Sequence, residues 1–393
     1  MKKLGNEEKC NVADVLLNKN ASLRGQKVAI YCGKEKITYA SLLENVNRFA
    51  NSLKMLGVKP TERVMILMPD SPMFVYAFLG SIKYGAWPVP VNTMLNESDY
   101  EYMLENSEAR VLVTEPLSKA AKITTKQFCF KLFTGGVLET LMEQASSHAE
   151  SYLAKAEDVA FWLYSSGSTG RPKGVPHRHA DLVHSADHYA KHVLNMNEND
   201  IVFSVSKLFF AYGLGNSLNF PFRYGASVVL LPSPPTPEIV METVSKFKPT
   251  VFFGVPTQYN SVLKKMNGNA PFKSVRACAS AGEALPPEIF YKWKEKTGLE
   301  ILDGIGSTEA LHVYISNMPG NVRPGTSGRV VPGYEAKIVD DEGNEVPVGE
   351  PGQLIIKGNS ITKGYWERPD EKREKLLPDN WFKTGDMYAQ EDG

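Results

Sequence analysis

The chain lacks several features that define whole classes of protein. Its four cysteines stand far apart with no C-x-x-C pair, which argues against a disulfide framework and a cysteine zinc site. The 44 basic and 44 acidic residues cancel, so the basic surface of a dedicated nucleic-acid or membrane-surface binder is missing. No apolar run approaches the length of about eighteen residues that spans a membrane. We expect a soluble, cytoplasmic protein whose partners are small molecules, without nucleic acid or membrane.

The pattern of apolar residues indicates α/β architecture. A length of 393 residues with 42% hydrophobic content predicts two or more packed units. From about residue 60, short apolar runs alternate with amphipathic stretches, which is typical of βαβ units. The expected strands and helices of the first array are 63–68, 71–84, 89–91, 96–106 and 110–114. Those of the second array are 227–231, a helix from Pro237, 250–254, 257–266, 275–280, 286–296 and 299–303.

Two further signals complete this outline. Thr236 and Pro237 are typical of the N-cap and the first position of a helix. After about residue 325, short strands at 334–339 and 353–357 flank a glycine turn, which predicts a small β unit. The chain therefore reads as two doubly wound α/β lobes followed by a small β unit.

A glycine-rich loop carries the strongest chemical signal. The strand-like run 161–164 leads into Ser-Ser-Gly-Ser-Thr-Gly-Arg-Pro-Lys-Gly at 165–174. Glycines that permit positive φ, hydroxyl groups, exposed N–H groups and a lysine suit a loop that cradles phosphates. The spacing is not G-x-x-x-x-G-K-[ST], so the loop is not the P-loop of kinases and GTPases. A merely flexible surface loop explains the glycines and serines but not the Thr-Gly-x-Pro-Lys-Gly order.

Four motifs in one order resemble a known superfamily. The loop at 165–174 is followed by Gly-Glu-Ala at 282–284, Gly-Ile-Gly-Ser-Thr-Glu at 304–309 and Thr-Gly-Asp at 384–386. Together they resemble the adenylate-forming superfamily of acyl-CoA synthetases, luciferases and peptide-synthetase adenylation domains, over nearly the whole chain. The resemblance implies a large N-terminal domain, 1–393, of two doubly wound α/β lobes plus a small β-barrel. The approximate parts are 60–200 for one lobe, 20–59 with 201–324 for the second, and 325–393 for the barrel.

The resemblance also implies a binding site for ATP. The glycine-rich loop would hold the β- and γ-phosphates through Ser165, Ser166, Gly167, Ser168, Thr169, Gly170 and Lys173. Thr169 and Lys173 would be its catalytic side-chain contacts. Backbone around Gly282, Glu283 and Ala284 would flank the adenine, and Asp303 would accept a hydrogen bond from the adenine amino group.

The remaining motifs would complete the nucleotide site. The residues after Asp303 that would touch the nucleotide are Gly304, Ile305, Gly306, Ser307 and Thr308. Thr308 would contact the α-phosphate, and Glu309 would bind Mg²⁺, which neutralises charge as a carboxylate oxygen attacks the α-phosphorus. Asp386 would accept hydrogen bonds from both ribose hydroxyls. Ile305 departs from the family pattern, since many relatives have an aromatic residue there, so apolar packing would replace an aromatic contact with adenine.

The run Phe-Phe-Ala-Tyr-Gly-Leu-Gly-Asn at 209–216 is similar to the acyl pocket of benzoate-type aryl-CoA ligases. The substrate-binding residues so implied are Phe210, Ala211, Tyr212, Gly213, Ile305, Gly306 and His312. A flat aromatic acid suits such a wall, in which Phe210 would be the gate between the acyl and thiol sites. His312 could bond a ring hydroxyl or amino group, or cap the pocket of plain benzoate. Because an unpaired buried polar group is costly, a partner for His312 would favour benzoate.

The reaction implied is that of an AMP-forming acid–thiol ligase. A carboxylate and Mg-ATP would give acyl-AMP and pyrophosphate, and coenzyme A would then attack to give acyl-CoA and AMP. We expect benzoate as the best acid. Alternatives are a short-chain or medium-chain acyl-CoA synthetase, an aryl-acid adenylation domain that delivers to a carrier protein, or a non-catalytic nucleotide-binding module. A homodimer is left open.

The end of the chain bears on the expected activity. The sequence ends at Gly393, shortly after Asp386. In the superfamily a mobile C-terminal domain with a catalytic lysine follows that point, and we expect it to be absent here. The chain by itself should then bind ATP and the acid but form acyl-AMP slowly and acyl-CoA hardly at all, because positioning groups are missing.

Histidines concentrate just after the phosphate loop. His184, His188 and His192 recur at i, i+4 and i+8, a spacing that can bind zinc on a helix. No H-E-x-x-H motif accompanies them. The neighbouring Asp181, Asp187 and Lys191 indicate a solvated helix rather than a metal site.

Overall fold

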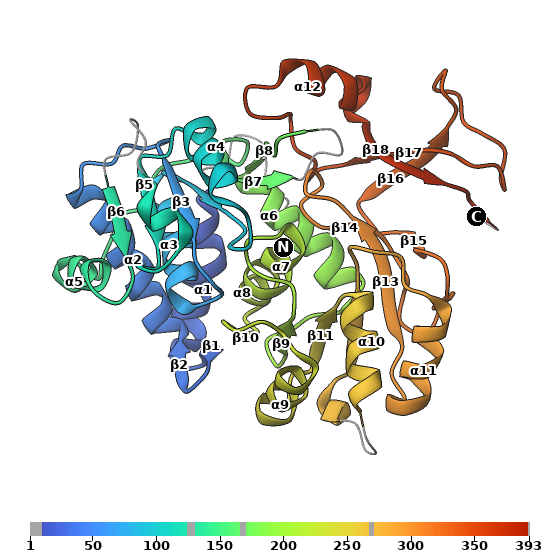
Figure 1. Cartoon of the computed structure of the whole chain (residues 1–393), viewed down its shortest axis with the longest axis horizontal. Coiled ribbons are helices and arrows are strands. Elements are labelled where there is room, and N and C mark those ends of the chain that lie inside the picture. The colour runs from blue at the N-terminus through green and yellow to red at the C-terminus, as the bar shows by residue number, and fades with distance from the viewer. Residues whose placement is uncertain (1–9, 124–129, 166–169, 267–270, 392–393) are drawn as a thin grey trace.

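The computed structural model describes residues 10–123, 130–165, 170–266 and 271–391. Three regions follow one another in Figure 1: a blue-to-cyan N-terminal part, a central sheet with helices α9–α11 beside it, and a red C-terminal part. Within the described ranges, none of the helices has both the length and the apolar character needed to cross a membrane.

The first sheet is parallel, as the sequence predicted. Its strands lie in the order β4 (Trp87–Pro90), β3 (Arg63–Leu67), β5 (Val111–Thr114) and β6 (Phe130–Phe133). The helices between them are α3 (Pro72–Tyr84) and α4 (Glu97–Ser107). Local caps explain these bounds.

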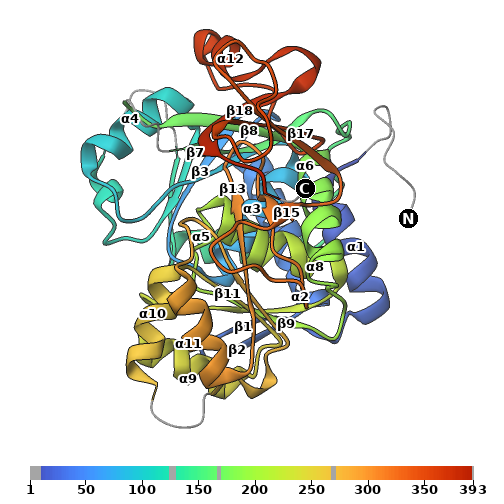
Figure 2. The same ribbon diagram turned by 90° about the vertical axis from the view of Figure 1, so that its right-hand side faces the viewer.

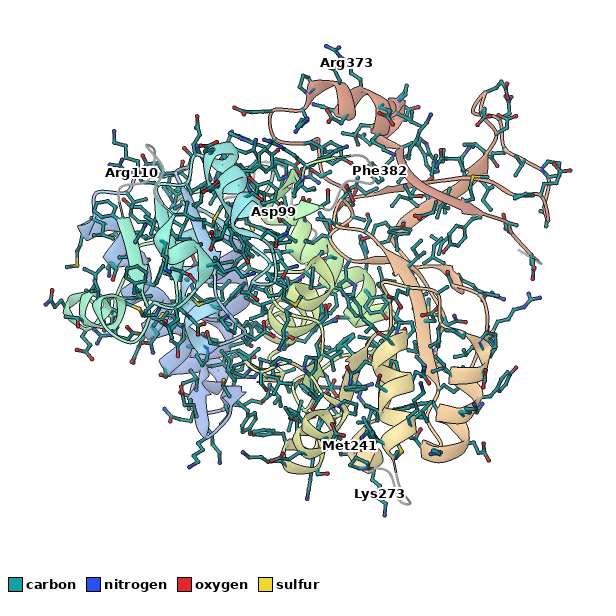
Figure 3. The ribbon with its side chains drawn as sticks, in the orientation of Figure 1. Asp99, Arg110, Met241, Lys273, Arg373 and Phe382 are labelled. Atoms are coloured by element: carbon teal, nitrogen blue, oxygen red, sulfur yellow. The ribbon has the colours of Figure 1, made fainter. Side chains whose placement is uncertain are left out.

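The caps of α3 and α4 are formed by residues that can be identified in the sequence. Ser71 caps α3 by accepting a hydrogen bond from the Phe74 N–H at 3.2 Å. Gly85 ends that helix with φ 95°, a conformation that favours glycine. At the start of α4, Asp99, labelled in Figure 3, accepts from the Asn96 N–H at 3.2 Å.

The second sheet has nine strands and forms the centre of the molecule. Its order is β15 (Arg329–Val330), β14 (Val313–Ser316), β13 (Ile301–Gly306), β12 (Ala277–Ser280), β11 (Val251–Gly254), β9 (Ile201–Ser204), β10 (Ser227–Leu230), β1 (Val28–Cys32) and β2 (Glu35–Thr38). The strands from β13 to β1 run parallel, and the edge strands β14, β15 and β2 are antiparallel. β13 is the last strand of the parallel part, so the residues that follow it lie where the sheet changes from parallel to antiparallel pairing.

The helices of this part confirm the predicted array. They are α9 (Pro237–Phe247), α10 (Pro256–Lys265) and α11 (Pro287–Thr297). Thr236 caps α9 and Pro237 occupies its first turn, as predicted. The N-terminal helices α1 (Val12–Arg24) and α2 (Tyr39–Met55) share a core with α3, and α5 (Val137–Gln144) follows β6.

Between the two sheets lies an antiparallel hairpin of β7 (Val159–Ser165) and β8 (Lys173–Arg178). It is followed by α6 (His179–Ser185) and a π-helical segment, Ala186–Ala190. The interpretation of this helical region as solvated was wrong. Asp181 is fully buried, because Arg178 pairs with it at 2.6 Å, and Asp187 pairs with Arg223 at 2.9 Å. Charged residues that pair in this way can be buried.

The C-terminal part contains a three-stranded antiparallel sheet, β16 (Tyr334–Val339), β17 (Gly352–Gly358) and β18 (Phe382–Tyr388), with α12 (Pro369–Lys375) before β18. The two views place α12 at the opposite end of the molecule from α9 (Figures 1 and 2). Phe382, labelled in Figure 3, is buried in a core shared with β11–β14. Closure of these strands into a barrel and the division into lobes remain predictions.

Candidate active site

The two ends of the predicted phosphate loop are the two strands of the central hairpin. Ser165 ends β7 and pairs with Lys173, the first residue of β8. Ser166, Gly167, Ser168 and Thr169 lie outside the described residues. On the returning side, the Tyr102 hydroxyl of α4 donates to the Pro172 carbonyl at 3.1 Å. The loop is therefore anchored at both ends.

Lys173 and Glu309 are brought together by one tyrosine. The Lys173 ammonium lies 5.8 Å from the centre of the Tyr365 ring, and the Tyr365 hydroxyl donates to Glu309 Oε1 at 3.1 Å. Lys173 also lies 3.9 Å from Glu371 at the start of α12. A lysine and a partly exposed carboxylate that share one neighbour can face a phosphate and its counter-ion.

The Thr308–Glu309 segment follows β13 at the edge where the sheet turns antiparallel. The Glu309 carbonyl accepts from the Thr362 N–H at 2.8 Å, and the Thr362 hydroxyl donates to the Pro176 carbonyl of β8 at 2.7 Å. Ser307 Oγ accepts from the Ala310 N–H at 3.2 Å. Segments from β8, β13 and the stretch after β17 thus converge on one point.

Asp303 lies in β13 with one carboxylate oxygen still available. Oδ2 accepts from the Leu285 N–H at 3.2 Å, whereas Oδ1 has no hydrogen-bond partner within the described part of the chain. Burial raises the pKa of Asp303 to about 6. Leu285 directly follows the exposed residues 282–284, so this free oxygen lies beside the segment predicted to flank adenine.

Two glycines of the 304–309 motif permit the turn of the sheet. A Cβ on Gly304 would lie 2.6 Å from the Ile315 carbonyl oxygen, and one on Gly306 would lie 2.6 Å from that of His312. Only glycine allows this approach of β13 and β14. Ile305 between them is partly buried against the core.

Asp386 lies exposed on β18, where its N–H donates to Thr384 Oγ1 at 3.0 Å. The pKa of Tyr314 on β14 is raised by burial first, and then by the negative charges of Asp386 and Glu309. Both carboxylates therefore influence the same buried tyrosine.

His312 is enclosed by aromatic rings. It is buried, with ring centroids 4.9 Å from Tyr189, 5.3 Å from Tyr212 and 4.5 Å from Phe220. Its Nε2 lies 3.0 Å from Asn216 Oδ1. Burial lowers the pKa of His312 to about 3, so the ring is neutral, and Nε2 then donates to the amide oxygen.

The predicted pocket run, 209–216, enters a single irregular helix at Ala211. This helix consists of α7 (Ala211–Leu214), the π-helical segment Gly215–Asn219 and α8 (Phe220–Tyr224). A Cβ on Gly215 would lie 2.4 Å from His312 Cδ2, so this glycine lets the imidazole approach the backbone. Such π-helical segments often occur at functional sites.

The first two residues of this run, Phe209 and Phe210, differ in exposure. Phe210 is 42% exposed and contacts the buried Phe209 with ring centroids 4.8 Å apart, a setting that suits a gate. Gly213, predicted to be a substrate-binding residue, has its open side filled by backbone. A Cβ there would lie 2.0 Å from the Lys207 carbonyl oxygen, so this glycine serves the turn.

The histidine run does not gather as metal ligands would. The His184 and His188 rings stack with centroids 6.0 Å apart, and His188 packs on Tyr334 at 5.2 Å, whereas His192 is exposed. Across the described ranges there is no cluster of three His, Cys, Asp or Glu residues that could hold a metal ion.

Three residues of the site were missed by sequence reasoning: His177, Asn216 and Tyr365. Asn216 closes the quoted pocket run, so its position was visible although its contact was not. His177 and Tyr365 carried no signal, because their contacts join segments far apart in the sequence.

Comparison with known proteins identifies the family. Residues 17–366 match the family of AMP-binding enzymes. Over 98% of its length the chain is 43% identical to the benzoate–CoA ligase of Thauera aromatica, of which it covers 75%. It is 35% identical to the 4-hydroxybenzoate–CoA/benzoate–CoA ligase of Rhodopseudomonas palustris, over 96% of this chain and 72% of that protein.

Solved structures agree with this match. A benzoate CoA ligase from Burkholderia xenovorans superposes with a TM-score of 0.90 at 41% identity, covering 96% of this chain and 77% of that one. An anthranilate CoA ligase in complex with anthranoyl-AMP gives a TM-score of 0.94 at 36% identity, with coverages of 100% and 78%. The chain belongs to the AMP-binding, adenylate-forming enzyme family. It is an AMP-forming ligase for the ATP-dependent joining of an aromatic acid to coenzyme A.

Proposed function

We propose that this ligase acts best on benzoate, that Mg²⁺ accompanies its ATP, and that the predicted residues carry the reaction. The observation that carries the proposal is the hydrogen bond between His312 and Asn216. This bond pairs the Nε2–H of His312 inside the protein, so that nitrogen needs no ring substituent, whereas the buried Nδ1 has no hydrogen-bond partner within the described part of the chain. The similarity to benzoate–CoA ligases supports the same choice of acid.

The nucleotide would be held at three points. Lys173 faces the phosphates from β8, the free Oδ1 of Asp303 accepts from the adenine amino group, and Asp386 accepts from the ribose. An unpaired buried carboxylate oxygen is costly in the empty protein, so a donor from the ligand compensates for it. This free oxygen fits an adenine better than a base with an acceptor at that position.

The partly exposed Glu309 carboxylate fits a magnesium ion. Mg²⁺ prefers carboxylate oxygen, water and phosphate oxygen, and the Tyr365 hydroxyl fixes the orientation of Glu309 by donating to Oε1. When bound, the ion would neutralise charge on the phosphates. The protein itself supplies orientation: the acid's carboxylate and the α-phosphorus are held together, and no nucleophile of the chain is required.

The acid would lie between the Phe210 gate and His312. The π-helical segment brings Gly215 and Asn216 to the imidazole, and Ala211 and Tyr212 line the approach. The aromatic rings around His312 offer apolar faces to a flat ring. A neutral histidine at the far wall suits an uncharged phenyl edge.

The balanced charge of the chain supports small molecules as its partners, and we include the cytoplasm as its location in the proposal. A homodimer is the assembly to be tested by measuring the mass of the protein in solution.

The test is thermal stabilisation with Mg-ATP or AMP and a panel of acids: benzoate, 2-aminobenzoate, 4-hydroxybenzoate, acetate and hexanoate. A ligand that binds only the native state raises stability by RT ln(1 + [L]/Kd), so the ranking reports the pocket without catalysis. We expect benzoate to rank first. A higher rank for hexanoate would refute the aromatic pocket, and one for 4-hydroxybenzoate would refute the role given to Asn216.

A further inference from the structure

His177 joins the strand after the phosphate loop to the motif that holds the α-phosphate. It lies on β8, is fully buried, and stacks on Phe161 of β7 with ring centroids 5.4 Å apart. Its Nε2 lies 2.8 Å from the Thr308 carbonyl oxygen. Because a carbonyl can only accept, Nε2 carries a hydrogen and donates it to Thr308.

Asp181 fixes the other side of the same ring. Its Oδ2 lies 3.2 Å from His177 Nδ1 and accepts from the Arg178 N–H at 2.9 Å. The Arg178 guanidinium lies 2.6 Å from Asp181 Oδ1 and donates to the Asn359 carbonyl at 2.6 Å. The carboxylate is fully buried, so its position is determined by these contacts alone. A carboxylate that orients an imidazole in this way sets which nitrogen faces the site.

The carbonyl groups of Thr308 and Glu309 are held from two directions. His177 donates to the first at 2.8 Å, and the Thr362 N–H donates to the second at 2.8 Å. Among the described residues, His177 is the one side chain recorded as a donor to the Thr308 carbonyl, which otherwise accepts from the Leu311 N–H. The direction of this peptide determines where Thr308 stands relative to a bound nucleotide.

We propose that His177 is a positioning residue. Oriented by Asp181, it holds the Thr308 peptide in the direction that lets Thr308 meet the α-phosphate, and it couples the phosphate-loop hairpin to that motif. The inference rests on the proposed function, in which Thr308 contacts the α-phosphate. It assigns to the buried histidine a part in nucleotide binding beyond filling the core.

The experiment compares AMP with adenosine, which lacks the phosphate. In His177→Phe the ring and its stacking on Phe161 remain, but the Nε2–H donor to Thr308 and the contact of Nδ1 with Asp181 are lost. We expect the affinity for AMP to fall by about tenfold while the affinities for adenosine and benzoate stay unchanged, because a lost orienting contact typically costs ten- to a hundredfold. His177→Gln, whose amide can donate from a similar distance, should recover most of the affinity for AMP. His192→Phe changes an exposed histidine nearby and should behave as the unmodified chain.

A purely structural role predicts another pattern. Equal losses for AMP and adenosine, or an unchanged affinity for AMP, would overturn the proposal. Should His177→Phe not fold, His177→Asn and His177→Gln form a second pair: Asn can replace the contact of Nδ1 with Asp181 but cannot reach Thr308. We expect only Gln to keep the preference for AMP over adenosine, and equal behaviour of the two variants would refute the proposal. If the unmodified chain binds benzoate but does not prefer AMP over adenosine, the contact of Thr308 with the α-phosphate is refuted. The role proposed for His177 is then refuted with it.

Discussion

The Nε2 atom of His312 donates to Oδ1 of Asn216 across 3.0 Å, and both residues are buried. The bond joins the residue just before β14 to the π-helical segment Gly215–Asn219. It therefore sets the polarity of the wall that an acid would meet, and it can be removed at either end.

Asn216→Leu removes the acceptor and leaves a buried N–H unpaired. We expect a loss of about 1–3 kcal/mol in the free energy of unfolding, which denaturant titration measures. The freed Nε2–H should then bind a ring substituent, so 4-hydroxybenzoate or 2-aminobenzoate should gain affinity relative to benzoate. Asn219→Leu is the matched control, since Asn219 is equally buried but donates to the Leu182 carbonyl instead. A similar change of acid preference in both variants would contradict this role.

Asp303→Asn replaces one of the two carboxylate oxygens, either Oδ1 or Oδ2, with an amide NH₂ group that donates hydrogen bonds. The amide N–H would face either the adenine amino group or the Leu285 N–H, and both are donors. We expect adenosine and AMP to lose affinity together, whereas benzoate keeps its own. Calorimetric titration of the three ligands checks this. Loss of benzoate affinity to the same extent would indicate general damage to the fold.

The pH dependence of stability offers a second view of Asp303. Burial raises its pKa from 3.8 to about 6, so the folded chain holds the proton more tightly than the unfolded chain. The cost of ionising it is absent below about pH 4, grows as the pH rises to about 6, and is complete above that. The free energy of unfolding of Asp303→Asn should therefore improve relative to the unmodified chain over this interval. A constant difference from pH 4 to 7 would contradict the shift.

Glu309→Gln should abolish the benefit of magnesium. The amide retains an oxygen that accepts from the Tyr365 hydroxyl but lacks the charge that attracts the ion. We expect ATP to bind the variant equally with and without Mg²⁺, whereas Mg²⁺ strengthens binding to the unmodified chain. Glu342→Gln, on an exposed turn, serves as control. Persistence of the magnesium effect in Glu309→Gln would place the ion elsewhere.

Ile305→Tyr introduces the aromatic residue that the family resemblance led us to expect at this position. An aromatic face against adenine contributes about 0.5–1.5 kcal/mol beyond apolar burial, so affinity for adenosine should rise a few-fold. The preference for adenine over guanine should not change, because we assign that preference to Asp303. Competition between ATP and GTP for the variant measures both effects.

Local signals predicted the helices well. Ser71 with Pro72, and Thr236 with Pro237, fix the starts of α3 and α9 because a cap depends only on its nearest neighbours. The family motifs likewise named Lys173 and Glu309, and the structure gives both a contact with Tyr365. What these signals share is that a few consecutive residues contain all the information needed.

Other parts of the molecule depend on contacts between distant residues. The pairing of β1 with β10 joins the start of the chain to the central sheet, and no local pattern reports it. The solvation assigned to α6 failed because Asp181 and Asp187 look like surface charges until their arginine partners are known. The π-helical segments insert one residue per turn, which shifts the faces of a helix without changing its composition.

Two of the hydrogen bonds of Thr362 have a consequence for cooperativity. Its N–H holds Glu309 and its hydroxyl holds β8, and the stretch that carries it leads out of β17. Loosening the small sheet would thus weaken the nucleotide site, while a bound nucleotide would slow hydrogen exchange of amides in β16 and β17, which carry none of the proposed nucleotide contacts. The hydrogen-exchange rates of the C-terminal strands would then report whether a nucleotide occupies the site.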